Sequence, residues 1–100
     1  MVQILVTFDI RPGLEEDYAR FVKDVGMPFW QDRPGILAVR GLRNVLGGSP
    51  QIVAEVDCES LESAWAALTD AEYESVLKQQ SDFVTNRSVL LLTPTGRTTD

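Results

Sequence analysis

The side chains of this sequence that could do chemistry are a few hydrogen-bond donors and cations beside apolar segments. Tyr73 could donate a hydrogen bond to a phenolate or carbonyl oxygen of a bound molecule. Arg40 and Arg87 carry positive charge that could hold a developing oxyanion. Alternatively, Tyr73 is the first residue of an apolar helical stripe and both arginines are solvated surface charges, which is the position that we expect for Arg87.

Carboxylates form a second candidate group. Glu55 and Asp57 alternate along one predicted strand and therefore share a face of it. Facing inward, they could act as acid and base or hold a metal ion; facing outward near a strand end, they would be solvated, as would Asp9. No spacing of acidic or cysteine residues matches a metal motif, and Gly47-Gly48 falls in a predicted hairpin rather than at a phosphate-binding helix N-terminus. We therefore predict no metal and no cofactor.

Residue types that are absent or rare narrow the chemistry further. The chain has no histidine, which removes the commonest general base, the commonest metal ligand and any histidine-centred triad. It has one cysteine, Cys58, so an intrachain disulfide is excluded. A lone cysteine at the end of a strand is expected to be a small buried apolar group rather than a nucleophile.

Length and composition indicate one domain. One hundred residues give room for a single core, and 44% hydrophobic and 24% charged residues are typical of soluble globular proteins. The net charge of -6 argues against binding to nucleic acid or to an anionic membrane. With no signal-peptide pattern and no long apolar run, we predict a cytoplasmic protein. The predicted domain spans residues 1–93, and a polar tail, predicted to be mobile, spans residues 94–100.

Hydrophobic periodicity predicts the order strand, helix, strand, strand, helix, strand. The first helix is expected to end near Val25, because Gly26 and Pro28 follow. In the second helical region, Ser60 is a predicted N-cap and the pattern at residues 69–72 predicts a fresh helical start. The predicted strands are residues 2–9, 36–45, 51–57 and 88–93, and the helical regions are residues 14–25 and 60–83.

This order of elements predicts an α+β fold of the ferredoxin-like βαββαβ type, in which both helical regions cover one face of a four-stranded antiparallel sheet. The strands carry apolar residues on both faces rather than the polar alternation of a solvated sheet. A bare apolar face is larger than monomers usually expose, so we predict a homodimer in which two sheets pack face to face. Alternatively, some of these residues lie at strand ends or under the tail. The apolar residues that compete for the bare face are Leu5, Leu37, Val39, Leu90 and Leu92.

Four segments make the chain resemble the dimeric α/β-barrel superfamily, in particular the antibiotic-biosynthesis monooxygenase-like, NIPSNAP and EthD-like small proteins. The first, FDIRPGLEE at residues 8–16, leads from a strand into a helix, and PGI at residues 34–36 opens the next strand. EVDCESLESAW at residues 55–65 carries an acidic strand end into a helix, and TDAEY follows at residues 69–73. These segments cover nearly the whole chain and are specific for architecture rather than for function.

The resemblance implies a dimeric barrel with a cleft in each subunit between the sheet and the helices. Members of the superfamily bind small, often aromatic molecules there; some are cofactor-free monooxygenases that oxidise quinol-type substrates with dioxygen, and others degrade heme, remove halide or isomerise lactones. Members also place a tryptophan against the ligand where this chain has Trp65, although Trp65 could instead pack on the sheet as part of a helical stripe. Trp65, Tyr73 and Arg40 are the candidates for catalysis. The predicted ligand-binding residues are Phe8, Trp30, Arg40, Trp65, Tyr73 and Phe83.

The chain also departs from the pattern of these relatives. The heme-degrading branch uses an asparagine on the first strand and a histidine after the tryptophan, whereas this chain has Thr7 and Phe8 there and no histidine. The polyketide-oxidising branch has an asparagine one turn before the tryptophan, where this chain has Leu61. A metal-free route would need the substrate anion itself to react with dioxygen in a desolvated site. Three functions stay open: a cofactor-free monooxygenase acting on an aromatic or quinol-type molecule, a binding module without turnover, and a dimerisation domain without a ligand.

Overall fold

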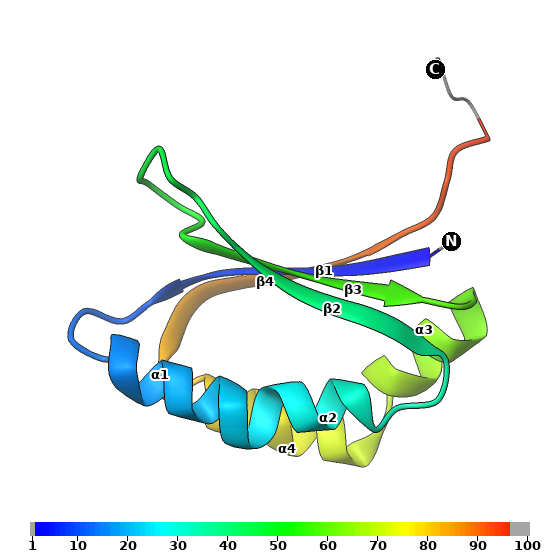
Figure 1. Ribbon diagram of the computed structural model, residues 1–100, viewed down its shortest axis with the longest axis horizontal. Helices are drawn as coiled ribbons and strands as arrows, with labels where there is room; N and C mark the ends of the chain where they lie inside the picture. Colours follow the sequence, from blue (N-terminus) through cyan, green and yellow to red (C-terminus); the bar gives the residue numbers. More distant parts are fainter. Residues whose placement is uncertain (1, 97–100) are drawn as a thin grey trace.

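The computed structural model describes residues 2–96 as two layers, with a four-stranded antiparallel sheet on one side and all the helices on the other (Figure 1). The predicted ferredoxin-like βαββαβ fold is therefore confirmed, with the strand order β2-β3-β1-β4. Part of the predicted tail, residues 97–100, lies outside the described residues. The elements are β1 (Val2–Ile10), α1 (Glu15–Phe21), η1 (Val22–Gly26), α2 (Met27–Gln31), β2 (Ile36–Arg43), β3 (Ile52–Cys58), α3 (Leu61–Leu68), α4 (Ala71–Gln80) and β4 (Val84–Leu92).

The core lies between the helices and the central strands. β1 pairs antiparallel with both β3 and β4, and every second residue of it points toward the helices. Ile4 is opposite Val56 in β3, and both are fully buried. Phe8, near the other end of β1, is also buried. The period-2 pattern of β1 thus fixes which face of the sheet the helices cover.

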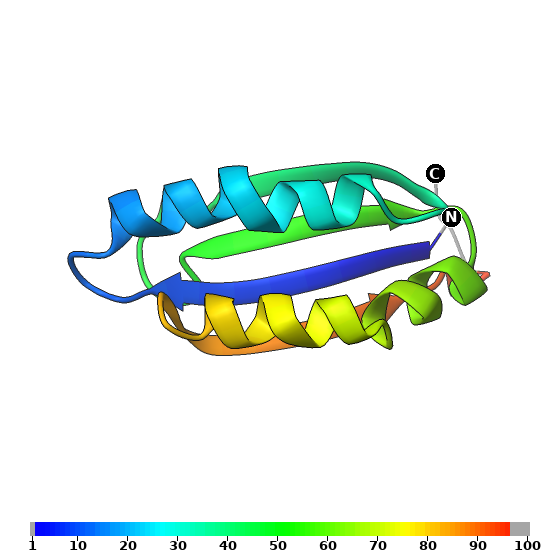
Figure 2. The same ribbon diagram turned by 90° about the horizontal axis from the view of Figure 1, so that it is seen from below.

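The first helical region runs without a break from residue 15 to residue 31, past the predicted end near Val25 (Figure 2). Gly26 has ordinary right-handed helical dihedral angles, and η1 is a π-helical segment directly before α2. Pro28 lies in the first turn of α2, where a residue without an N–H is tolerated. Because the wider π-helical turn shifts the hydrogen-bond register before the proline, the helix continues where Gly26 and Pro28 were expected to stop it.

The second helical region begins and restarts as predicted. Ser60 caps α3, since its hydroxyl accepts a hydrogen bond from the N–H of Ser63 at 3.1 Å. A second start occurs at Asp70, whose carboxylate accepts from the N–H of Glu72 at 2.8 Å. Thr69 is not the cap of α4, because its hydroxyl donates to the carbonyl of Trp65 at 2.8 Å. The region is therefore two short helices, α3 and α4, that meet at residues 69–70 (Figure 2).

The last strand begins at Val84, four residues earlier than predicted. Asn86 has a positive φ of 55°, and the pairing of β4 with β1 shifts register between Thr7 and Asp9. Such an irregularity breaks the alternation that identifies a strand in sequence. The polar residues 85–87 therefore fall outside the predicted strand, although Thr85 pairs with Asp9 of β1.

The face of the sheet that the helices leave uncovered is partly apolar. Leu5 and Leu90 are opposite each other on neighbouring strands and point away from the helices. The exposed fractions of Leu90 and Leu92 are 47% and 40%. Val39, which was expected to compete for this face, instead pairs with buried Val56 and lies on the helix side. We call the uncovered side of the sheet the open face.

Candidate functional site

A cavity of about 120 Å³ lies between the sheet and the helices. Its floor includes Gly41 of β2, which is paired with Ala54 of β3 on the covered side of the sheet. A β-carbon added to Gly41 would meet no atom within 4 Å, so the small residues leave space that larger side chains would fill. The lining residues from the helices are Tyr18, Phe21, Val22, Gly26, Met27, Trp30, Tyr73, Val76, Leu77 and Gln80, and those from the sheet are Val6, Phe8, Val39, Arg40, Gly41, Ile52 and Ala54.

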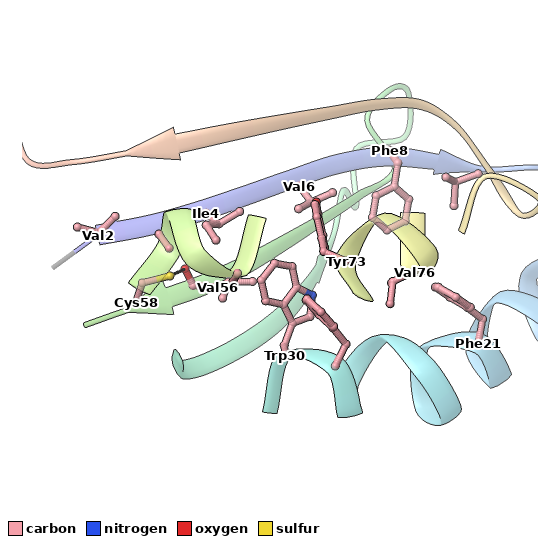
Figure 3. Close-up of a cluster of buried hydrophobic side chains, with 14 residues drawn as sticks. Val2, Ile4, Val6, Phe8, Phe21, Trp30, Val56, Cys58, Tyr73 and Val76 are labelled. Atoms are coloured by element: carbon pink, nitrogen blue, oxygen red, sulfur yellow. Dashed lines mark hydrogen bonds between the residues drawn. The ribbon is translucent and has the colours of Figure 1, made fainter. Parts of the chain in front are cut away.

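Three aromatic rings from α2 and α4 pack at one end of the cavity. The centroids of Phe29 and Trp30 are 5.0 Å apart, and Tyr73 lies 5.5 Å from each of them. These distances are typical of stabilising aromatic pairs. Figure 3 shows Tyr73 reaching from its helix toward Val6 of the sheet, beside Trp30. The ring cluster joins α2 of the first helical region to α4 of the second.

Tyr73 carries a hydroxyl that forms no hydrogen bond with the described residues. Its side chain is only 7% exposed, and its hydroxyl is the one buried side-chain nitrogen or oxygen atom in residues 2–96 without a hydrogen-bond partner. Burial raises the pKa of Tyr73, and the positive charge of Arg87 acts more weakly in the opposite direction. The hydroxyl is therefore protonated at neutral pH and available as a donor.

Tyr18 of α1 is the second phenol of the cavity, and it differs from Tyr73 in having a partner. Burial raises its pKa to about 12, while a hydrogen bond with Gln80 acts in the opposite direction. Its ring packs against Phe8 with 5.4 Å between centroids. Tyr18 is thus held between the sheet and α4, with its hydroxyl already engaged.

The π-helical segment η1 forms part of the cavity wall. Val22 and Gly26 from η1 and Met27 just after it line the cavity. A π-helical turn inside a helix is rare and occurs frequently at functional sites. Here it widens the helix beside the space left by Gly41 and Ala54.

Arg33, which follows α2, fastens that helix to the start of α4. One guanidinium nitrogen donates to the Asp70 carboxylate at 3.0 Å and another to Glu72. Nε donates to the carbonyl of Phe29 at 3.1 Å, and the guanidinium lies 4.5 Å from the centroid of the Phe29 ring. The Arg33 side chain is only 17% exposed. This contact, which we call the Arg33 clamp, fixes Phe29 beside Tyr73.

The structure brings four of the six predicted ligand-binding residues to the cavity and leaves the other two elsewhere. Phe8, Trp30 and Tyr73 line it, and their role in binding stays a prediction. Trp65 is 62% exposed on the outer side of α3 and is not among the lining residues, and neither is Phe83, whose ring packs against Phe21. Arg40, the last of the six, borders the cavity only through its strand.

The guanidinium of Arg40 lies on the open face, away from the cavity. It donates to Glu55 at 3.2 Å and to Asp57 at 2.8 Å, and Asp57 also accepts from Gln3 at 3.1 Å. The hydrogen bond from Arg40, followed by that from Gln3, lowers the pKa of Asp57. Hydrogen bonds from Asp57 and Glu55 raise the pKa of Arg40. The two carboxylates that share a face of β3 therefore pair with a cation, and we call this group the Arg40 network.

The remaining polar candidates have local partners. Arg87 is exposed and donates at 3.3 Å both to the carbonyl of Leu77 and to the side chain of Gln80. Asp9 accepts from Ser49 at 2.6 Å and from Asn86 at 2.9 Å, and the Asn86 bond is the largest cause of its lowered pKa. Asp9 thereby ties the base of the β2–β3 hairpin to β4.

Cys58 is buried and free, as expected from its place at a strand end, and burial raises the pKa of its thiol. In the part of the chain that the structure describes, no group of three acidic or cysteine side chains is arranged to hold a metal ion. Within residues 2–96, none of the helices has the length and apolar character needed to cross a membrane.

Sequence reasoning did not identify several residues that shape the site. Arg33 lies between a predicted helical region and a predicted strand. No local pattern relates it to its carboxylate partners, which lie far along the chain. Gly41 looked like an ordinary strand residue, and only the pairing with Ala54 places it on the cavity floor. Tyr18 lies in the predicted helical region at residues 14–25, and nothing in that prediction indicated its interaction with Gln80.

No family model and no curated protein matches this chain, but solved structures share its fold over nearly its whole length. The protein At3g17210 from Arabidopsis thaliana has a TM-score of 0.83 at 13% identity, covering 99% of this chain and 100% of that one. A putative antibiotic biosynthesis monooxygenase from Deinococcus radiodurans has a TM-score of 0.79 at 10% identity, covering 100% and 97%. SnoaB, a cofactor-independent oxygenase from Streptomyces nogalater, has a TM-score of 0.71 at 17% identity, covering 96% and 94%. At these identities the matches confirm the predicted structural resemblance to antibiotic-biosynthesis monooxygenase-like proteins and establish the fold alone.

Proposed function

We propose that this protein binds a small, largely apolar molecule in the cavity between its sheet and its helices. The observation that carries the proposal is an apolar space of about 120 Å³ beside the buried, unpartnered hydroxyl of Tyr73. An engineered apolar cavity of roughly 150 Å³ is enough for a protein to bind benzene. The paired small residues Gly41 and Ala54 keep the space open where ordinary packing would close it.

A cavity-filling variant tests this proposal. In Gly41→Leu the new side chain enters the cavity at a position where strain from a positive φ does not arise. Neutral single-ring aromatic probes should raise the melting temperature of the wild type, because they bind the native state, and should fail to raise that of Gly41→Leu. Ala66→Leu adds the same kind of bulk on the exposed side of α3 and should respond like the wild type. Equal responses in all three proteins would place binding outside the cavity and contradict the proposal.

A second candidate function is cofactor-free oxygenation of an aromatic or quinol-type molecule bound in the same cavity. SnoaB, which shares the fold, is a cofactor-independent oxygenase. The dry walls and the Tyr73 donor are what such a route requires, since a substrate anion that reacts with dioxygen must be desolvated and its oxygen stabilised. The charge of Arg87, which acts on the Tyr73 hydroxyl, has the sign that favours an oxyanion. Among residues 2–96 no base lines the cavity, so the substrate would have to ionise by itself.

Oxygen uptake separates catalysis from binding alone. The protein is incubated in air with aromatic quinols, and uptake is compared between the wild type and Tyr73→Phe. Loss of an oxyanion donor typically lowers turnover by about a hundredfold or more, so uptake should fall close to the blank in the variant. If no quinol gives uptake above the blank with the wild type, the non-catalytic binding module is the function that remains.

We also propose that the open face packs against the open face of a second copy. Leu90 and Leu92 are exposed on it, next to Leu5, and contiguous apolar surface of this kind marks an interaction site. The β2–β3 hairpin rises from the sheet on the same side, opposite the helices (Figure 1), and carries Val45 and Leu46 fully open to solvent at its tip. A second sheet would cover both.

Native mass spectrometry at micromolar concentration tests the homodimer. The wild type should be dimeric, and Leu90→Glu should shift the distribution to monomer because it buries a charge at the interface. Leu61→Glu is the matched control, since Leu61 is a similarly exposed leucine on α3, away from the sheet. A monomeric wild type would remove the proposal.

A further inference from the structure

The hydroxyl of Tyr73 can specify more about the ligand than the cavity walls do. It is buried under α2 and the sheet, and within residues 2–96 no other buried side-chain polar atom is left without a partner. Buried polar groups are nearly always hydrogen-bonded, and each exception calls for an explanation. A bound molecule that brings one hydrogen-bond acceptor to the cavity would satisfy this hydroxyl.

The other polar groups around the cavity are already engaged. Gln80 lowers the pKa of Tyr18 and accepts a hydrogen bond from Arg87 at 3.3 Å, and the guanidinium of Arg40 pairs with carboxylates on the open face. Inside the cavity a ligand therefore meets mostly apolar walls, and the Tyr73 hydroxyl is the one buried side-chain donor of residues 2–96 that has no partner. An anionic ligand would lose its hydration and gain only one hydrogen bond, which disfavours carboxylates.

The size of the cavity limits the ligand in a second way. Its volume of about 120 Å³ is slightly below the roughly 150 Å³ apolar cavity that holds one benzene ring. The flanking rings of Phe8, Trp30 and Tyr18 provide flat apolar surfaces, and all of them are anchored by further aromatic contacts. Two fused rings would require these walls to move.

Resting on the function proposed above, we propose that the cavity takes a neutral molecule with a single ring and one hydrogen-bond acceptor, and that the Tyr73 hydroxyl binds this acceptor. The acceptor, either a carbonyl or a phenol oxygen, lies against Tyr73 near Val6 of the sheet. The ring lies over Gly41 and Ala54. Tyr73 thus selects the ligand by a hydrogen bond and the cavity selects it by size.

Four probes test the proposal by titration calorimetry with the wild-type protein. Benzaldehyde and styrene are planar single rings with equal numbers of non-hydrogen atoms, but only benzaldehyde carries an acceptor. Benzaldehyde should bind about tenfold more tightly than styrene, the factor that one hydrogen bond supplies. Benzoate, which is charged, and 2-naphthaldehyde, which has two rings, should each bind at least about tenfold more weakly than benzaldehyde.

Two variants that each remove one hydroxyl, one inside the cavity and one outside it, locate the effect. Tyr73→Phe keeps the ring and removes the hydroxyl, so it should lower the affinity for benzaldehyde about tenfold, to that of styrene, and leave the affinity for styrene unchanged. Thr69→Val removes a hydroxyl that donates to a backbone carbonyl outside the cavity and should keep the preference for benzaldehyde. Amide chemical shifts of residues around Gly41 and Val76 report that each probe occupies the cavity.

The outcomes separate this inference from the function on which it rests. If the probes shift the cavity amides but styrene binds the wild type as tightly as benzaldehyde, the role of Tyr73 is wrong while the binding function stands. If benzoate or 2-naphthaldehyde binds as tightly as benzaldehyde, the restriction by charge or by size is wrong. If no probe shifts the cavity amides, the proposed binding function itself is overturned. The comparison of probes on the wild type holds even if Tyr73→Phe does not fold.

Discussion

The two faces of the sheet are made by the same four strands, yet they carry opposite chemistry. Under the helices, Ile4 and Phe8 of β1 are buried among apolar residues, and the free polar group nearby is the single hydroxyl of Tyr73. On the open face, the alternating residues include Gln3 and Leu5, and three charged side chains of the Arg40 network lie beside exposed leucines. The covered face therefore has a hydroxyl donor without an acceptor, whereas the charged side chains of the Arg40 network on the open face are paired with one another.

This difference separates groups that are available to a ligand from groups that are not. Arg40 has the stronger charge, but both Glu55 and Asp57 already hold it, so a ligand would have to displace two carboxylates. Tyr73 is a weaker donor, but apolar surroundings make each hydrogen bond to it worth more than in water. Arg40, although it carries a full charge, is therefore less available to a ligand than Tyr73.

The largest expected effect comes from removing a large side chain from the covered face. Phe8→Ala deletes a fully buried ring that contacts Tyr18, and such a change should lower the free energy of unfolding by about 3–5 kcal/mol. Leu5→Ala, on the open face of the same strand, should cost only about 1 kcal/mol in a monomer, because Leu5 is half-buried. Urea unfolding of both variants measures the difference.

Protein concentration sharpens this comparison. If two open faces pack together, the loss caused by Leu5→Ala should depend on concentration, because association contributes to the stability of the folded state. The loss caused by Phe8→Ala should change much less with concentration. Equal losses in the two variants at concentrations where the protein is monomeric would mean that the faces do not differ as the structure describes.

A smaller effect is expected at the Arg33 clamp, which holds the helices over the covered face. Arg33→Ala removes the bond to the Phe29 carbonyl and the contact with the Phe29 ring, and should lower the free energy of unfolding by about 1–3 kcal/mol. The ion pairs themselves add little, because Asp70 and Glu72 are partly exposed.

Arg20→Ala is the control for the Arg33 clamp. Arg20 also pairs with a carboxylate, that of Asp17, but both side chains are exposed. Its loss should cost less than about 0.5 kcal/mol. If the two arginine variants lose the same stability, Arg33 is an ordinary surface charge and does not fix Phe29 beside Tyr73.

Most of the fold could be predicted from the sequence, because most strands and helices show a pattern that involves only neighbouring residues. The alternation in β1 and the caps at Ser60 and Asp70 depend on residues within a few positions of one another. The run past Gly26 and Pro28 could not be predicted, since a π-helical turn has no simple pattern. The early start of β4 was hidden by its irregular pairing with β1.

The site was predicted less completely, because it depends on which residues meet across the fold. Residue type singled out Tyr73 and the family resemblance singled out Trp65, and only the structure separates a buried hydroxyl from an exposed ring. Arg40 was predicted to be a cation of the cavity, but the register of β2 and β3 places its guanidinium on the open face. A cavity forms where side chains are too small to fill the space between elements. The sequence around Gly41 does not indicate that this glycine borders such a space.

The smallest expected effect, a dependence of stability on pH, sharpens the contrast between paired and unpaired groups. Hydrogen bonds from Arg40 and then Gln3 lower the pKa of Asp57 in the folded protein, so the charged carboxylate stabilises the fold above its ordinary pKa of about 4. This contribution is lost as the pH falls through the lowered pKa. Urea midpoints between pH 7 and about pH 2.5 should therefore show the wild type more stable than Asp57→Asn at neutral pH, with the gap narrowing only below about pH 4.

Asp9 provides the internal check on this last measurement. Its pKa is also lowered, by bonds from Asn86, Ser49 and Gln51, and it is present in both the wild type and Asp57→Asn. Its loss of charge therefore cancels in the difference between the two proteins, and the narrowing that remains belongs to the Arg40 network. Parallel curves down to the lowest pH would mean that Asp57 gains nothing from Arg40. The guanidinium would then be held by Glu55 alone, and the contrast between a fully paired Arg40 and an unpaired Tyr73 would be smaller than the structure indicates.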